Sequence, residues 1–312
     1  MKRVAVGLVL VVGLCSLVLP RYWSAKLLPD LLADAAVSGV AAIGVCFVLA
    51  CGSLDLAVGS LAACSSLVVA AAVGAGWPPA AALALGIAFG GAVGWGMGHI
   101  LRVTRVPAFI GTLGGLFALR ALALWYAEES IAIQDPAFAE WSAWSWSSGD
   151  GRWRPAALTL VIVTAVGAYV MHAWHAARCA WVVGADVQAA RQAGLDPDAV
   201  RVRMHTVSGV CGGLAGVLLA LSSGAGTAIG ASGLELDALA CAVVGGASLL
   251  GGRASVPGAV LAALLFAAMA RGLQFAGIAD AGWGRLLAAL LLFLYLALDR
   301  LATRAPSGQQ RS

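Results

Sequence analysis

Long apolar segments follow one another along the whole chain, and only short polar breaks separate them. Because a bilayer crossing needs roughly 20 consecutive apolar residues, each segment is a candidate transmembrane helix. Only 11% of the 312 residues are charged, whereas a soluble domain carries about 25%. The sequence therefore predicts an all-α, polytopic integral membrane protein. We place about ten spans at residues 4–19, 32–51, 55–74, 79–101, 107–127, 155–173, 204–222, 236–251, 256–274 and 284–299.

Glycine-rich breaks interrupt this pattern at Gly52-Ser53 and at 224–226. Broken or re-entrant helices are tolerated where protein or water surrounds the freed backbone, so we expect such segments here. An acidic-aliphatic sequence follows each break, Leu54 to Gly59 in one case and Leu234 to Asp237 in the other. This similarity predicts two weakly related halves, a plan common among transporters.

Lys and Arg favour the cytoplasmic side of a membrane, and their placement predicts that both termini are cytoplasmic. The predicted inside segments hold Lys2, Arg3, Arg102, Arg105, Arg178, Arg191, Arg201, Arg203, Arg253, Arg300, Arg304 and Arg311. The predicted outside segments hold only Arg21, Lys26, Arg152, Arg154, Arg271 and Arg285. Residues 1–312 then form a single transmembrane domain.

Two loops and a tail lie outside the predicted spans. We expect an outer loop at 128–154, rich in Trp and acidic residues, a cytoplasmic loop at 174–203 and a cytoplasmic tail at 300–312. Lys2 and Arg3 before the apolar run from Val4 to Leu19 match a signal peptide, but the many following spans favour an uncleaved first helix.

Several classes of protein are excluded. Lys occurs only at Lys2 and Lys26, so the chain has no phosphate-binding loop ending in Gly-Lys-Ser/Thr. The seven Cys form no Cys-x-x-Cys pair, and His172 and His175 lack the Glu of a zinc-protease motif. We therefore expect no catalytic residues, no bound metal and no cofactor, and the absence of a basic run argues against nucleic acid as a partner.

Four ionisable residues fall within apolar segments. A charged side chain at membrane depth costs free energy, so each of these residues is a candidate for a functional role. Asp55 either caps a helix start or takes part in transport. Arg120 either pairs with a carboxylate or contacts a polar permeant. Glu235 and Asp237 open the eighth span.

Two further patterns concern helix packing and contacts with a partner. Gly86, Gly90, Gly94 and Gly98 recur every four residues, a stripe that lets another helix approach closely. In the cytoplasmic loop, the Ala-rich segment 183–195 predicts a short helix closed by Gly194. Such a helix suits docking into a partner's groove, and the alternative is an ordinary interfacial connector.

Three motifs, in the order in which they occur along the chain, resemble those of the permease subunits of bacterial binding-protein-dependent ABC importers. The resemblance is to the branch that serves ribose, xylose, galactose and autoinducers. The motifs are Leu54 to Gly59, Val106 to Gly114, and Glu235 to Ala240 followed by Val244 to Arg253, and the resemblance covers about residues 35–300. The sequence departs from the family pattern at Ala57, at Ala185-Asp186 and at Ala121.

The resemblance implies a role for each motif and a set of partners. The segment 184–195 would be the coupling helix that contacts the ATPase, with Gly184, Asp186, Ala189, Ala190, Arg191 and Gly194. Other family positions are Asp55, Gly59, Pro107, Glu235, Asp237, Gly245, Gly246, Gly251, Gly252 and Arg253, and we expect Phe109, Thr112 and Arg120 to line the translocation path. The implied partners are an ABC ATPase that binds ATP and Mg, a second permease subunit and an external solute-binding protein.

The function that follows is translocation of a small polar solute, a sugar above all, driven by ATP hydrolysis in a separate subunit. One alternative is a secondary transporter coupled to H+ or Na+, in which Asp55, Glu235 and Asp237 form the ion site. Another is a structural or signalling membrane protein that transports nothing.

Overall fold

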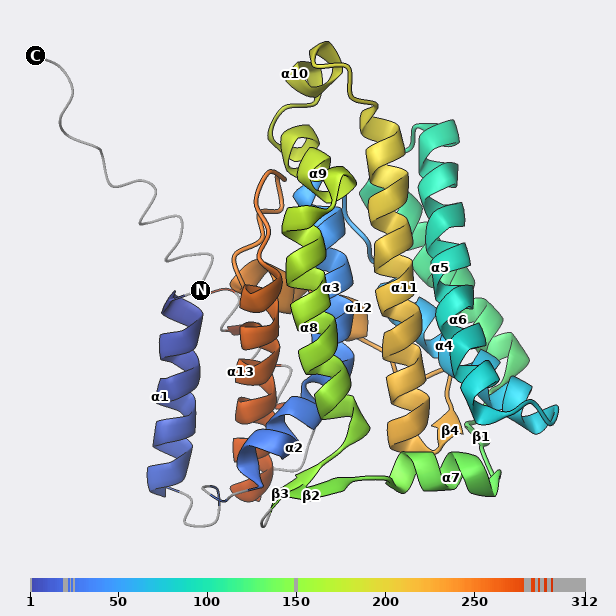
Figure 1. Cartoon of the computed structure of the whole chain (residues 1–312), viewed down its shortest axis with the longest axis vertical. Coiled ribbons are helices and arrows are strands. Elements are labelled where there is room, and N and C mark those ends of the chain that lie inside the picture. The colour runs from blue at the N-terminus through green and yellow to red at the C-terminus, as the bar shows by residue number, and fades with distance from the viewer. Residues whose placement is uncertain are drawn as a thin grey trace, which may run out of the picture.

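The structure, a computed structural model, is a bundle of helices (Figure 1). It describes residues 2–18, 22, 24, 26–148 and 151–277, together with residues 282, 283, 286, 289, 290 and 293. The longer helices are α1 (Lys2–Val18), α3 (Ala36–Ala50), α4 (Val58–Gly74), α5 (Pro79–Thr104), α6 (Ala108–Tyr126), α8 (Pro155–Ala173), α11 (Pro197–Ser223) and α13 (Val256–Phe275). The shorter ones are α2 (Leu27–Asp34), α7 (Pro136–Ala143), α9 (His175–Ala185), α10 (Val187–Gln192) and α12 (Leu234–Val244).

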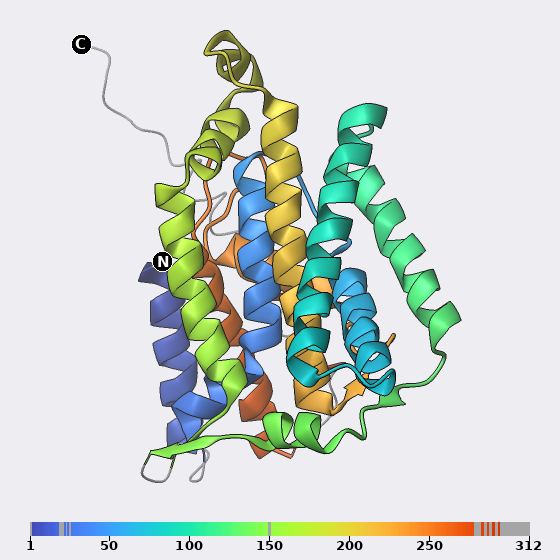
Figure 2. The same ribbon diagram turned by 45° about the vertical axis from the view of Figure 1, so that its right-hand side comes forward.

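The bundle has two distinct ends. Helix α10 lies at one of them, which we call the α10 end, and α7 lies across the other, the α7 end (Figure 1). Helix α11 runs between the two ends through the middle of the bundle and packs against α3, α4 and α5. Helix α6 lies at the periphery (Figure 2) and buries only Thr112 and Ala123. The described part of the bundle is therefore built around α11, with α6 exposed at its edge.

The predicted glycine stripe is confirmed as a close helix contact between α5 and α11. A Cβ added at Gly90 would lie 2.6 Å from the Cα of Gly213, and one added at Gly94 would lie 2.8 Å from the Cα of Gly209. No side chain fits between backbones at this separation. Small residues on both helices thus allow α5 to pack directly on the central helix.

The predicted number of ten spans is not confirmed. Within the described residues, five helices are long and apolar enough to cross a membrane, namely α5, α6, α8, α11 and α13. Helices α2 and α3 form a sixth span if they are taken together, and they are bent by 53°. Helices α1 and α4 are shorter apolar helices. Most of the predicted span 284–299 and all of the tail 300–312 lie outside the described residues.

The prediction of a full span at 236–251 is wrong. Helix α12 ends at Val244, and a turn with Gly246, Gly251 and Gly252 at positive φ follows it. A helix of 11 residues is about 16 Å long at a rise of 1.5 Å per residue, roughly half of a bilayer core. The largely apolar sequence of residues 236–251 did not indicate this turn.

The predicted break at 52–53 is also a break in the structure. Helix α3 ends at Ala50 and α4 begins at Val58, so residues 51–57 form a non-helical connection, which we call the 51–57 connection. Helices α4 and α12 therefore both start after a glycine-containing break, as the sequence predicts.

The outer loop predicted at 128–154 is an ordered layer on the α7 end in its described part. It contains β1 (Ile131–Ala132), α7, β2 (Trp146–Ser148) and β3 (Gly151–Trp153), and β2 pairs with β3 in an antiparallel hairpin. Strand β1 pairs with β4 (Ala225–Gly226), which follows α11. The carboxylate of Asp135 accepts a hydrogen bond from the amide of Phe138 and caps α7. This layer fixes the chain reversal between α11 and α12.

Candidate functional site

Asp55 attaches the 51–57 connection to the central helix. Its side chain is 5% exposed. Oδ1 accepts a hydrogen bond from the amide of Ala57 at 2.9 Å, and Oδ2 accepts one from the hydroxyl of Ser208 on α11 at 2.6 Å. Asp55 thus binds the backbone amide of Ala57, the residue before α4, and links it to α11, although α4 has no side-chain cap of its own.

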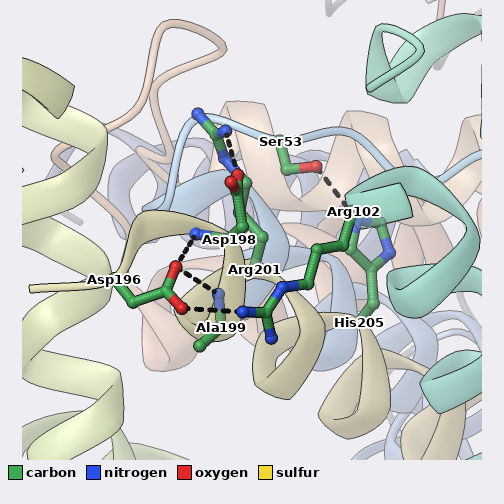
Figure 3. A network of polar contacts seen from close by, with 7 residues as sticks. All are labelled: Ser53, Arg102, Asp196, Asp198, Ala199, Arg201 and His205. Atoms are coloured by element: carbon green, nitrogen blue, oxygen red, sulfur yellow. Dashed lines mark hydrogen bonds and ion pairs between the residues drawn. The ribbon is translucent and has the colours of Figure 1, made fainter. Parts of the chain in front are cut away.

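A second hydrogen bond attaches the same connection to α11. The hydroxyl of Ser53 lies 2.9 Å from Nε2 of His205, whose side chain is 1% exposed (Figure 3). Nothing in the sequence pairs these two residues, because they are 152 positions apart. A histidine near the start of the apolar segment 204–222 was the only available signal.

The start of α12 packs against the start of α4. A Cβ added at Gly59 would overlap the carboxylate of Glu235 and would lie 2.9 Å from the amide nitrogen of that residue. The two acidic motifs, far apart in sequence, therefore meet in the structure. Gly59 is needed here because any side chain would separate the two short helices.

Arg120 of α6 binds the turn that leads into α12. Its Nη1 donates to the carbonyl of Ala228 at 2.6 Å, and its Nη2 donates to the carbonyl of Ala231 at 3.4 Å and lies 3.8 Å from Oε2 of Glu235. The side chains of Arg120 and Glu235 are 16% and 13% exposed. Of the two predicted roles for Arg120, pairing with a carboxylate is the one that the contacts display.

The other two residues predicted to line a path have different surroundings on α6. Phe109 is 54% exposed, whereas Thr112 is fully buried and donates its hydroxyl to the carbonyl of Ala108 within the same helix. Asp237, in the first turn of α12, is half-buried. Pro107 precedes α6 and gives the chain the extended backbone from which the helix starts.

The short helix predicted in the cytoplasmic loop is present as α10. The carboxylate of Asp186 accepts hydrogen bonds from the amides of Gln188 and Ala189 at 2.7 and 3.1 Å and caps the helix. Gly194 follows it with φ +80°, in the left-handed region. Ala190 is fully buried, while Ala189 and Arg191 are exposed. Helix α10 therefore presents one face outward at the extreme end of the bundle (Figure 1).

Gly184 belongs to α9 and not to this helix, which corrects the predicted segment 184–195. A Cβ added at Gly184 would overlap the carbonyl oxygen of Ala50 and would lie 2.5 Å from the amide nitrogen of Gly252. A Cβ added at Gly251 would lie 2.8 Å from the Cα of Gly52. We call these four glycines, Gly52, Gly184, Gly251 and Gly252, the glycine junction.

The glycine junction connects α9 with both helix breaks. The amide of Gly252 donates to the carbonyl of Ala50 at 3.1 Å, so the end of α3 is bonded to the turn that follows α12. Gly245 packs against Gly258 and Ala259 at the start of α13. Gly246 has φ +106°, and Arg253 is exposed in the same turn. The late glycine motif thus shapes a turn that contacts α9.

A cavity of about 750 Å³ opens at the α10 end beside these contacts. The sequence did not predict it, since its residues come from segments far apart in the chain. Its lining includes Gly52, Ser53, Pro107, Asp198 and four arginines, Arg102, Arg105, Arg191 and Arg201.

Two of these arginines are paired with carboxylates. Nη2 of Arg102 lies 2.9 Å from Oδ2 of Asp196, and Nη1 of Arg201 lies 3.3 Å from Oδ1 of Asp198 (Figure 3). A hydrogen bond from the amide of Ala199 and the nearby positive charge of Arg102 lower the pKa of Asp196 below 3.8. Since the folded pKa is lowered, this stabilising contribution is present above pH 3.8 and is lost as the pH falls through the lowered pKa.

Among the described residues, no group of three or more His, Cys, Asp or Glu side chains is arranged to hold a metal ion. His99 packs edge-on against Trp95, and His172 packs edge-on against Trp181. His175 lies beside Cys179. In the described part of the chain, these histidines therefore have packing partners in the bundle.

Taken together, these features are those of a multi-pass membrane protein with broken helices and a short exposed helix at one end, an architecture compatible with a transport subunit. The chain matches the model of the family described as the branched-chain amino acid transport system permease component over residues 27–296. The chain therefore belongs to this family, whose members are transport subunits and not enzymes.

Several relatives of this chain are named as permeases. The chain is 30% identical over 300 residues to the inner membrane ABC transporter permease protein YjfF of Escherichia coli, covering 96% of this chain and 91% of that one. It is 28% identical to the ribose import permease protein RbsC of Escherichia coli, covering 89% and 87%. It is 27% identical to the fructose import permease protein FrcC of Rhizobium meliloti, covering 90% and 79%. No solved structure matches the chain.

Proposed function

We propose that this chain is the membrane subunit of an ABC importer that carries a monosaccharide or a related sugar across a bacterial inner membrane. The family match over residues 27–296 carries the assignment as a permease. The family description mentions amino acids, but the relatives named above include import permeases for ribose and fructose, and these names favour a sugar.

The charge distribution supports a cytoplasmic α10 end. Described Arg residues at this end are Arg102, Arg105, Arg178, Arg191, Arg201, Arg203 and Arg253, whereas the α7 end carries Lys26, Arg152, Arg154 and Arg271. Arg271 is moreover paired with Asp30 and Asp34. The positive-inside rule favours a cytoplasmic position for α10, and we propose the same for both termini, as the charge pattern of the sequence predicts.

The ATPase subunit would dock on the exposed face of α10. Movement of α10 would be passed to α9, which contacts the glycine junction at Gly184. From there it reaches the 51–57 connection before α4 and the turn after α12, because both pack against Gly184. Rigid helix segments joined by such contacts can rock between two arrangements. The glycine junction is thus the mechanical link between ATP hydrolysis and the short helices.

A second permease subunit would cover the exposed face of α6. Its side chains Phe109, Ile110 and Phe117 are 54%, 58% and 64% exposed, and the helix buries little against the rest of the described chain. The path would then run along α6, near Phe109, Thr112 and Arg120, with the solute-binding protein docked on the layer at the α7 end. ATP and Mg would be bound by the ATPase subunit alone.

Two of the three carboxylates predicted for an ion-coupled carrier have protein partners. Asp55 accepts two hydrogen bonds, and Glu235 lies 3.8 Å from Arg120. These contacts favour structural roles for Asp55 and Glu235 over a role as an ion site.

Replacing Gly194 with valine tests the role of α10. A β-branched residue at φ +80° costs on the order of 1–2 kcal/mol, which destabilises the end of the helix. We expect the assembled transporter to lose most of its solute uptake while the complex still hydrolyses ATP, which is measured by paired uptake and phosphate-release assays in proteoliposomes. Uptake at the unmodified rate would contradict the assignment of α10 as the coupling helix.

A further inference from the structure

We propose that the cavity at the α10 end is a binding site for a phosphate group, namely that of a membrane phospholipid or of a free phosphate ester. The cavity holds about 750 Å³ and is lined by residues from α5, α6, α10, α11 and the 51–57 connection. A recess between the ends of several helices is large enough for a phosphate with its substituent. The proposal does not depend on which solute the permease carries.

The charges in the cavity leave two guanidinium groups available. Arg102 and Arg201 have carboxylate partners, Asp196 and Asp198. Arg105 and Arg191 form no ion pair with any described residue, and both are exposed. These two guanidinium groups therefore have no direct ion pair within the recess, although the charge of Arg191 acts on Asp196 at longer range. A guanidinium group binds phosphate through two parallel hydrogen bonds, so this lining favours a phosphate over a neutral ligand.

The backbone around Arg105 keeps this side chain at the cavity. Arg105 has φ 54° and is the only described residue other than glycine with a positive φ. This conformation ends α5 and turns the chain toward Pro107 and α6. A bulky residue in the left-handed region costs free energy, and such strain is concentrated at functional positions.

The position of the cavity along the bundle suits a lipid headgroup. Val103 and Val106, on either side of Arg105, are 78% and 37% exposed, so apolar helix surface adjoins the arginines. Basic recesses between helix ends on the cytoplasmic side bind phospholipid headgroups. An acidic segment of a partner protein is the competing occupant, and the recess between helix ends favours a compact anion over an extended peptide.

The test uses the purified full-length chain in an uncharged detergent with two probes. Inorganic phosphate is titrated by calorimetry, and phosphatidylglycerol and phosphatidylcholine are compared by native mass spectrometry. The test variant is Arg105→Gln/Arg191→Gln. The matched control is Arg178→Gln/Arg203→Gln, which also removes two exposed arginines at the α10 end but none that line the cavity.

We expect phosphatidylglycerol to bind more tightly than phosphatidylcholine. The test variant should bind phosphatidylglycerol about tenfold or more weakly, since it lacks two guanidinium groups that would donate charge-assisted hydrogen bonds to the phosphate. The control variant should bind as the unmodified chain does. Binding of inorganic phosphate without binding of phosphatidylglycerol would assign the site to a free phosphate ester.

Three results would overturn the proposal. They are no binding of either probe, equal weakening in the test and control variants, and unchanged binding in the test variant. If neither probe binds, an acidic segment of a partner protein becomes the favoured occupant of the recess. Melting temperatures of both variants show whether each is folded, and since all four side chains are exposed, we expect little change.

Discussion

Replacing Gly184 with alanine is expected to abolish most of the solute uptake of the assembled transporter. The added methyl group would overlap the carbonyl oxygen of Ala50 and would lie 2.5 Å from the amide nitrogen of Gly252. Both neighbours are backbone atoms that hydrogen-bond to each other, so neither can move without breaking the glycine junction. Overpacking of this kind costs about 1–3 kcal/mol, and we expect a lower melting temperature together with the loss of uptake.

The matched control is the same substitution at Gly96 on α5. A Cβ added at Gly96 meets no described atom within 4 Å, and the residue lies within a helix, so alanine should be tolerated. Uptake is measured per folded transporter, after size-exclusion chromatography, to separate a loss of coupling from a loss of protein. Near-normal uptake by Gly184→Ala would show that α9 does not pass movement through this contact.

The glycine junction illustrates what the sequence could predict and what it could not. The apolar pattern with the motif order predicted a helical membrane protein, the break at 52–53 and the short helix closed by Gly194. That Gly52, Gly184 and Gly251 meet could not be predicted, because they lie in three segments with no periodic relation to one another. Gly184 was consequently assigned to the docking helix, although its contacts place it in the packing of α9.

Replacing Arg120 with methionine is expected to destabilise the bundle by about 3 kcal/mol, the cost of leaving a buried carboxylate without its partner. The carboxyl group of Glu235 would lose its cationic partner, and the carbonyls of Ala228 and Ala231 would lose their donor. The turn before α12 should then detach from α6. Thermal unfolding in detergent measures the loss of stability, and uptake should fall with it.

Two further variants define the origin of this effect. Arg120→Met/Glu235→Met removes both charges and should recover part of the lost stability, because replacing a buried pair with apolar residues is nearly neutral. Arg102→Met breaks the ion pair between Arg102 and Asp196, whose side chains are 43% and 51% exposed. This substitution should lower the free energy of unfolding by less than about 1 kcal/mol. Equal melting temperatures for Arg120→Met and Arg102→Met would show that the Arg120 contacts do not hold the turn.

The residues within the apolar segments show a similar limit of prediction. Asp55, Arg120 and Glu235 were recognisable from sequence because charge is costly at membrane depth. Their partners were not, since Ser208, the carbonyls of Ala228 and Ala231, and Gly59 carry no signal of their own. The length of α12 was mispredicted for a related reason, as hydropathy does not distinguish a short helix followed by a glycine turn from a full span.

The central claim is that this chain moves its solute by coupling to a separate ATPase at α10, and its most direct test is purification of the chain from its native membrane in a gentle detergent. Mass spectrometry identifies the proteins that copurify, and an ATPase assay is carried out on the same sample. We predict an ATP-hydrolysing protein with a phosphate-binding loop, and its loss when residues 186–194 are replaced by a flexible linker. An ATPase-free oligomer that takes up solute on an ion gradient would contradict the claim.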